Sequence, residues 1–228
     1  MAVAVLLPLS CYLVVSKLSK GKVIMPKHYV IESIAPDPDA GGRPDTTYHA
    51  ISELTLTNQM GRQVSVNKDL TGKMLVIDFF FADCNATCPK LTKSMRLLQN
   101  SFRKDPKKET SLENEIQFIS ITVMPERDSF QVMRKYADRY DANHDHWWFL
   151  TGDKQTIYNF ARKDLGLTTG EGDGGADDFI HSDKLVLIDK DRFIRGYYNG
   201  LNDTDVRKCA DDIVLLTLER KHKKKVNK

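Results

Sequence analysis

Two cysteines lie four residues apart, Cys84 and Cys88, between an apolar run and a segment with helical spacing. The free N–H groups and positive dipole end at a helix start stabilise a thiolate and lower a cysteine pKa. Thiolate is the form that attacks disulfides and binds metals. Two sulfurs at i and i+4 converge when the residues between them wind as a turn. The pair therefore predicts a disulfide or a two-sulfur metal site, in preference to two inert structural cysteines.

A histidine is the residue type best suited to complete such a metal site. Two soft sulfurs alone suit Cu(I), and an added imidazole makes a site that holds Cu(I) or Cu(II). His181 follows a glycine-rich segment and stands near the start of a predicted strand, where it could approach the cysteines at one end of a sheet. A lone histidine beside apolar residues is more often structural, so the cysteine pair is what makes His181 a candidate ligand.

Hydrophobic periodicity predicts the elements that position these residues. The predicted strands are a hairpin over 53–66, buried strands over 74–81 and 116–123, a short strand over 147–150 and a terminal hairpin over 179–198. The predicted helices begin at Pro89, at Asp128 as N-cap with a face of Phe130, Met133, Ala137 and Tyr140, near Ile157 and near Val206. This order predicts an α/β, thioredoxin-like fold, with a mixed central sheet flanked by helices and an added N-terminal hairpin.

The chain divides into four parts. Residues 1–22 contain an apolar run over 2–15 that predicts a membrane anchor or signal segment, although it is shorter than the roughly 20 residues of a spanning helix. Cys11 in this run is interpreted as unmodified rather than lipidated. Prolines and glycines predict a linker over 23–48, followed by the domain over 49–218 and a basic tail over 219–228.

The charges of the 228-residue chain are concentrated at its ends. The net charge is +3, yet the tail 219–228 alone carries +5, residues 1–22 carry +3 and the body 23–218 carries −5. A mildly acidic body lacks the clustered cations that nucleic acid requires, so we expect no nucleic-acid partner. The sequence favours a solvated terminus as the state of the tail.

Four other residues have side chains that could take part in chemistry, but a simpler interpretation is available for each. Asp78 sits inside an apolar strand, so its carboxylate is expected either to tune the cysteines or to be bonded locally. His144 and His146 are interpreted as solvated or capping residues before a strand. Cys209 falls on the apolar face of the last helix and is interpreted as a packed small hydrophobe.

Three motifs resemble those of the Sco/SenC family of copper proteins. They are Phe-Phe-Ala-Asp-Cys-Asn-Ala-Thr-Cys-Pro-Lys-Leu at 80–91, Val-Met-Pro-Glu-Arg-Asp at 123–128 and Phe-Ile-His-Ser at 179–182. The motifs occur in the family's order, and the likeness covers about residues 50–218. One departure is Met124, which stands where the family commonly has an aspartate, although Asp128 is retained.

The resemblance implies a membrane-tethered metallochaperone that helps to assemble the copper centre of cytochrome c oxidase. Cys84, Cys88 and His181 would be the copper ligands, and the recipient would be the copper-accepting oxidase subunit or another copper or thiol protein. The domain would face an extracytoplasmic oxidising compartment, with the bacterial periplasm favoured. A different class of function stays open, a thiol-disulfide oxidoreductase in which Cys84 attacks and Cys88 resolves.

Overall fold

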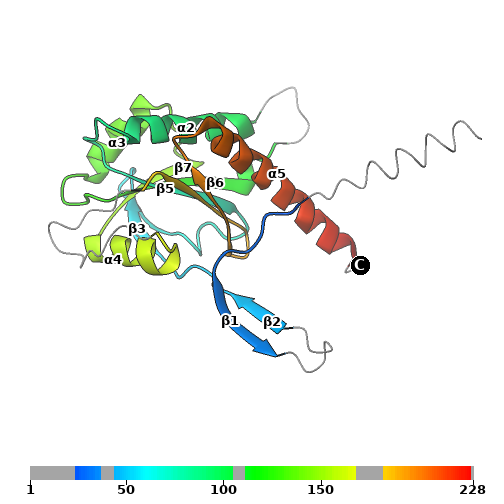
Figure 1. Ribbon diagram of the computed structural model, residues 1–228. Coiled ribbons are helices and arrows are strands. Elements are labelled where there is room, and N and C mark those ends of the chain that lie inside the picture. The colour runs from blue at the N-terminus through cyan, green and yellow to red at the C-terminus, as the bar shows by residue number, and fades with distance from the viewer. Residues whose placement is uncertain (1–23, 37–43, 105–110, 168–181, 227–228) are drawn as a thin grey trace, which may run out of the picture.

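The computed structural model describes residues 24–36, 44–104, 111–167 and 182–226 (Figure 1). Its centre is a seven-stranded sheet with strand order β4-β3-β7-β6-β5-β8-β9. The strands of this sheet are β3 (Thr55–Asn58), β4 (Gln63–Ser65), β5 (Met74–Phe80), β6 (Ile116–Thr122), β7 (Trp147–Thr151), β8 (Lys184–Ile188) and β9 (Ile194–Asn199). The helices are α2 (Cys88–Phe102), η1 (Glu113–Glu115), α3 (Phe130–Arg139), α4 (Lys154–Asn159), η2 (Phe160–Asp164) and α5 (Asp203–Val226).

The sheet is mixed. Strands β5, β6 and β7 run parallel, whereas β3 and β8 pair antiparallel with β7 and β5. Every residue of β5 and β6 is buried, which explains why apolar residues predominate in both strands without a regular alternation. The hairpins β3–β4 and β8–β9 are both present. The predicted fold class and N-terminal hairpin are therefore confirmed.

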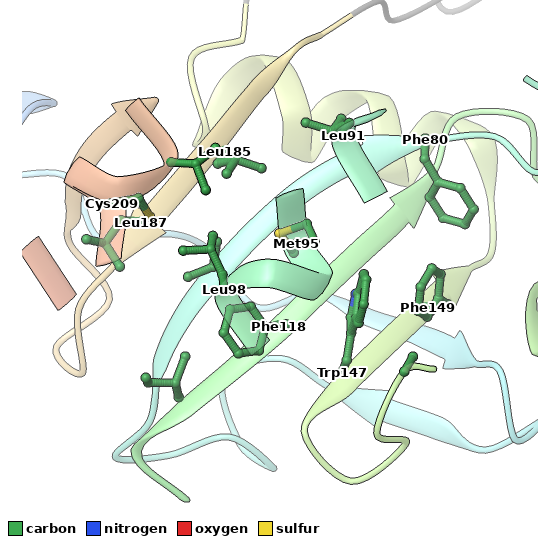
Figure 2. Packing of buried hydrophobic residues seen from close by; sticks show 14 of the residues in the cluster. Phe80, Leu91, Met95, Leu98, Phe118, Trp147, Phe149, Leu185, Leu187 and Cys209 are labelled. Carbon is green, nitrogen blue, oxygen red and sulfur yellow. The ribbon is translucent and has the colours of Figure 1, made fainter. Parts of the chain in front are cut away.

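Helices cover both faces of the sheet. Figure 1 shows α2, α3 and α5 on one side and α4 on the other. The core on the first side includes Met95 of α2, Met133 of α3 and Ile213 of α5, all with no exposed surface. Figure 2 shows side chains of this core, with Met95 and Leu98 beside Phe118. The second core joins the opposite sheet face to Ile157 and Tyr158 of α4. The sheet is thus closed off from water on both faces, as its central parallel strands β5, β6 and β7 require.

The Pro/Gly-rich range 23–48 differs from the predicted plain linker. Within it, β1 (Ile31–Pro36) pairs antiparallel with β2 (Pro44–Tyr48) as a separate two-stranded sheet. Proline stands only at the last residue of β1 and the first of β2, the strand ends that tolerate it. Ile31 and Ile34 of β1 are 53% and 63% exposed, so no burial pattern reveals this hairpin in the sequence.

Several predicted boundaries also change. Asp128 is not the N-cap of α3; Ser129 is, and its hydroxyl accepts a hydrogen bond from the Val132 backbone N–H. Phe130, expected on the buried face of α3, is 38% exposed. Strand β8 begins only at Lys184, and the glycine-rich loop and Phe179 lie outside the described residues. Helix α5 extends through the predicted basic tail as far as Val226.

Candidate metal centre

Cys84 and Cys88 lie together at the carboxyl end of β5, where the chain turns into α2. Both side chains are buried, with 7% and 6% of their surface exposed. The backbone N–H of Cys88 donates to Cys84 Sγ at 3.4 Å. Pro89 occupies the first turn of α2, where its missing N–H costs no helical hydrogen bond. The sequence-predicted arrangement of two thiols at a helix start is therefore present.

The pKa values of the two thiols are shifted in opposite directions. Burial disfavours a thiolate at Cys84, but the Cys88 thiol and three backbone N–H groups of the loop outweigh burial, so the pKa of Cys84 is lowered. Burial raises the pKa of Cys88 to about 12, and the hydrogen bond to Cys84 adds to the rise. Both thiols are free. Cys84 is thus the more nucleophilic sulfur, and a soft metal would have to displace the proton of Cys88.

Asp128 stabilises the cysteine loop through hydrogen bonds. Its Oδ2 accepts hydrogen bonds from the Ala82 backbone N–H at 3.0 Å and from Thr122 Oγ1 at 2.5 Å. Asp128 is only 3% exposed, and burial raises its pKa above the ordinary value. Arg127 next to it forms an exposed ion pair with Asp83 at 3.7 Å. The motif at 123–128 therefore stabilises the motif at 80–91. The sequence-based interpretation of Asp128 as a helix N-cap did not reveal this role.

Asp78 is a buried carboxylate in the strand that leads to the cysteines. Its Oδ1 accepts a 2.5 Å hydrogen bond from Ser120 Oγ, which in turn accepts from Trp147 Nε1 at 2.9 Å. No hydrogen-bond partner for Oδ2 is found within the described part of the chain. Burial raises the pKa of Asp78 to about 7, and its charge contributes to the raised pKa of Cys88. Both expectations for Asp78, local bonding and an effect on the cysteines, thus have support.

Met124, where the family commonly has an aspartate, lies in the loop between β6 and α3. Its backbone N–H donates to Thr122 Oγ1 at 3.0 Å. Its half-buried side chain packs against the core on the α4 side of the sheet. The substitution therefore extends an apolar surface at this loop, whereas Asp128 four residues later keeps its contact with the cysteine loop.

His181 lies outside the described residues, but the chain that follows it lies beside α2. Gly200 N–H donates to the Asp183 carbonyl at 2.7 Å, and the Gly200 carbonyl accepts from Ser94 Oγ of α2 at 2.7 Å. A Cβ at Gly200 would lie 2.2 Å from Leu91 Cδ1, so a larger residue here would displace the Leu91 side chain of α2. Residue 183 is therefore held against the helix that Cys88 begins.

The remaining candidates have structural roles. Cys209 has no exposed surface and lies beside Leu185 and Leu187 in the core (Figure 2), as predicted. His144 contacts Gln59 and Asp138. His146 lies 4.0 Å from Glu113, and its backbone N–H donates to the Asn143 carbonyl. Both histidines precede β7, at the sheet end opposite the cysteines.

Two absences hold for the described part of the chain only. Among residues 24–36, 44–104, 111–167 and 182–226, no three His, Cys, Asp or Glu side chains gather as a metal site. Within the same ranges no helix combines the length and the apolar character needed to cross a membrane. The three-ligand prediction thus depends on a residue outside these ranges.

Sequence comparisons place the chain among known proteins. The family model SCO1/SenC matches residues 43–216. The SCO1 protein homolog of Bacillus subtilis (strain 168) is 32% identical over 171 residues, which cover 74% of this chain and 83% of that protein. A Stutzerimonas stutzeri protein, provisionally described as copper-binding, is 29% identical over 65% of this chain and 68% of its own length.

Solved structures agree. A SCO1/SenC family lipoprotein from Bacillus anthracis has a TM-score of 0.62 and 25% identity, covering 74% of this chain and 95% of that one. BsSco, described as a member of the Sco family of cytochrome c oxidase assembly proteins with a disulfide switch, has a TM-score of 0.60 and 29% identity, covering 74% and 93%. With the family model matching most of its length, the chain belongs to the SCO1/SenC family.

Proposed function

We propose that this protein is a copper metallochaperone that helps to assemble the copper centre of cytochrome c oxidase. The observation that carries the proposal is the pair of buried thiols at the start of α2, with the Cys88 N–H donating to Cys84 Sγ at 3.4 Å. Two converging sulfurs form a soft donor set that suits Cu(I). Copper would be cargo, received and passed on by exchange of thiolate ligands.

His181 is the proposed third ligand, together with Cys84 and Cys88. Support comes from the chain that follows it, because only Ser182 stands between His181 and Asp183, and Asp183 is held beside α2 through Gly200. A chain advances at most about 3.6 Å per residue, so the backbone of His181 lies within about 7 Å of that of Asp183. An imidazole at this position would extend the donor set to one that also holds Cu(II).

The relatives support the cargo and the recipient. The S. stutzeri protein is described as copper-binding, and BsSco as belonging to cytochrome c oxidase assembly proteins. Applied to this chain, these descriptions favour the copper-accepting oxidase subunit as the partner. The B. anthracis relative is a lipoprotein, which supports membrane attachment. We assign the tether to residues 1–22 and the copper-binding domain to 49–218, in an extracytoplasmic compartment such as the bacterial periplasm.

A second function is favoured by the opposite pKa shifts of the two thiols. The lowered pKa of Cys84 suits attack on a partner disulfide, giving a mixed disulfide and one released partner thiolate. Cys88, once deprotonated, would attack Cys84 Sγ, release the second partner thiolate and leave a Cys84–Cys88 disulfide. Two electrons then pass to the partner. This thiol-disulfide oxidoreductase activity needs both cysteines but not His181.

Replacement of His181 separates the two functions. In the chaperone, His181→Ala should lower copper affinity by more than the roughly 10–100-fold that changes outside the ligand set cost, and should alter the sulfur-to-copper charge-transfer band of the Cu(II) form. In an oxidoreductase without copper, disulfide reduction should continue at the same rate. Unchanged copper stoichiometry and affinity in His181→Ala would refute the three-ligand site.

Cysteine variants provide the controls for this experiment. Cys84→Ser should abolish stoichiometric copper binding, whereas Cys209→Ala, which removes a fully buried thiol of α5, should leave it unchanged. Metal binding requires thiolates, so a verified Cys84–Cys88 disulfide should also take up no copper. Full binding by that disulfide form would count against both thiols as ligands.

A further inference from the structure

The hairpin of β1 and β2 stands apart from the central sheet. Its two strands form a sheet of their own, and Figure 1 shows them projecting from the body of the domain. The side chains of residues 31–35 in β1 are all exposed, so nothing in the described part of the chain covers them. An isolated two-stranded hairpin is marginally stable in water and normally needs a further surface to pack against. The hairpin therefore has a face that is suited to a contact outside the domain.

A β-bulge places the two isoleucines of β1 on one face of the hairpin. Ile31 pairs with Tyr48 and Ile34 pairs with Thr46, and the register shifts between Ile31 and Ser33. Tyr48 and Thr46 are two residues apart on β2, so their side chains point to the same face. Ile31 and Ile34 share that face, whereas residues three apart in a regular strand point to opposite faces. The bulge thus makes one face of an exposed hairpin apolar.

The chain that leads into this face is also apolar and exposed. Ile24 is 76% exposed and Tyr29 is 53% exposed, compared with 53% for Ile31 and 63% for Ile34. Of the ten large hydrophobic side chains that are exposed among the described residues, these four fall within the eleven residues 24–34. Single exposed hydrophobic residues are ordinary, whereas a group of them marks an interaction surface.

Both ends of the hairpin are fixed to the central sheet. The Tyr29 N–H donates to the Ile194 carbonyl at 3.1 Å, where the chain enters the hairpin. The Ile51 N–H donates to the Arg192 carbonyl at 3.1 Å, where the chain leaves it. Both acceptors lie in the last hairpin of the central sheet, at or just before the start of β9. The apolar face is therefore carried by a base that belongs to the folded domain.

The position of residues 24–34 in the chain indicates what this face contacts. The apolar run over 2–15, assigned above to the membrane tether, ends nine residue steps before Ile24. Nine steps reach at most about 32 Å, so a tether in the bilayer keeps the exposed segment close to the bilayer surface. Tyrosine is enriched at the headgroup level of membranes. Amphipathic segments with large apolar residues bury one face about 5–10 Å into the boundary between headgroups and acyl chains.

We propose that the exposed face of residues 24–34 rests on the lipid bilayer, with Ile31 and Ile34 at the boundary between headgroups and acyl chains. The contact rests on the proposed tether by residues 1–22 and adds to it a second, shallow attachment made by the folded domain. Glu32, the extra residue of the bulge, is exposed next to Ile31 and keeps the hairpin from entering further, because a charge in the hydrocarbon core is costly. Two attachments fix the orientation of the domain on the membrane.

This orientation determines where the cysteines lie. Ile194, which accepts from the first end of the hairpin, pairs with Ile188, and Ile188 pairs with Leu75 near the start of β5. Cys84 follows the other end of β5, a strand of seven residues or about 20 Å. With the hairpin on the bilayer, the cysteine loop lies at the end of the sheet away from the hairpin, where a partner can reach it.

Quenching of tryptophan fluorescence by brominated lipids tests the contact in the full-length chain. Ile34→Trp adds a fluorophore to the proposed face, and each variant is reconstituted into phosphatidylcholine vesicles with or without bromine on the acyl chains. The emission of Trp147 and Trp148 is measured in the unsubstituted chain and subtracted. The emission added by Ile34→Trp should lie at shorter wavelength than in water and should lose most of its intensity in the brominated vesicles.

Two control variants make the test specific for the face and for the hairpin. Ser33→Trp changes the neighbouring residue, which pairs with Thr47 and points to the opposite face, so its emission should be quenched clearly less. Val132→Trp replaces a side chain of α3 that is 39% exposed, and its emission should keep its intensity. Slow hydrogen exchange of the backbone amides of β5 reports in each variant that the domain remains folded.

Flotation of the chain with the vesicles reports separately on the tether. A chain that floats while Ile34→Trp is unquenched refutes the hairpin contact and leaves the tether standing. A chain that does not float refutes the tether and, with it, the contact that rests on it. Equal quenching at residues 33, 34 and 132 would also overturn the contact. Unquenched emission of Ile34→Trp that moves to shorter wavelength as the protein concentration rises would assign the face to a second copy of the chain instead.

Discussion

Cys84 and Cys209 are both buried, at 7% and 0% exposure, yet their surroundings give them opposite chemistry. Cys84 lies in a loop whose backbone N–H groups point at its sulfur, and its pKa is lowered. Cys209 lies on α5 in the core, where burial and then the nearby Asp212 raise its pKa far above the ordinary value. Burial opposes the thiolate at both positions, and at Cys84 the hydrogen-bond donors to the sulfur outweigh it.

Each region also contains a buried carboxylate, and the two carboxylates do different things. Asp128 accepts from the Ala82 N–H and thereby holds the cysteine loop. Asp212 accepts from Tyr198 at 2.7 Å and from Lys208 at 2.6 Å, which fastens α5 to β9 beside Cys209. The first carboxylate is thus placed to serve the site, whereas the second stabilises helix packing.

The largest expected difference between the two regions is in thiol reactivity. Iodoacetamide should modify Cys84 through local motion of its loop, whereas Cys209 becomes accessible only when the core opens. Core opening costs several kcal/mol, so Cys209 should react at least about a thousandfold more slowly. Mass spectrometry of peptides over a time course measures both rates in one sample.

Denaturant provides the control for the alkylation experiment. In an unfolding concentration of urea the two thiols should react at similar rates, because the loop donors and the core are both gone. Comparable rates for Cys84 and Cys209 in the native protein would show that the contrast between the two regions is wrong.

The fold could be predicted largely from the sequence because its central strands are buried on both faces. The mainly apolar runs at 74–81 and 116–123 correspond to β5 and β6 within one residue. The hairpin β1–β2 escaped prediction because Ile31 and Ile34 lie in solvent, so burial imposes no periodicity on them. Hydrophobic periodicity in a sequence arises from burial of one face, so an exposed hairpin shows no such periodicity.

The site could be predicted in part. The two cysteines were found because their spacing before a helix is a local signal. Asp128 was misassigned because an acid just before a helix is also typical of a cap, whereas its partner, Ala82, is 46 residues away. Arg195 donates to the Pro26 carbonyl and to Glu219 Oε2, and no local sequence signal indicates these contacts because the residues are far apart in the chain. Contacts distant in the chain need the fold before they can be seen.

Replacement of Asp78 tests how much this buried carboxylate of β5 contributes to the pH dependence of the free energy of unfolding. The folded protein holds this proton more tightly than the unfolded chain, with a pKa of about 7 against 3.8. The stabilisation is therefore complete below about pH 4 and is lost as pH rises through about 7, by about 4 kcal/mol at most. Asp78→Asn should flatten this part of the pH dependence, as measured by urea unfolding.

A matched aspartate at the surface controls the Asp78 experiment. Asp211→Asn changes an exposed side chain of α5 and should leave the pH dependence unchanged. The charge of Asp78 adds to the raised pKa of Cys88, so Asp78→Asn should also lower the pKa of Cys88 while that of Cys209 stays the same. A pH dependence that survives in Asp78→Asn would assign it to other groups.

The smallest effects are expected from a direct comparison of variants at the two buried carboxylates, Asp128 and Asp212. Asp128→Asn retains the shape of the side chain but weakens its bonds to Ala82 and Thr122, so the cysteine loop should loosen and copper affinity should fall about 10–100-fold. Asp212→Asn weakens bonds of the same kind beside Cys209 and should cost about 1–3 kcal/mol of stability without changing copper affinity. Competition titration with a Cu(I) chelator and urea unfolding measure the two quantities. Equal losses of copper affinity would mean that general stability, and not the fastening of the cysteine loop, governs the metal centre.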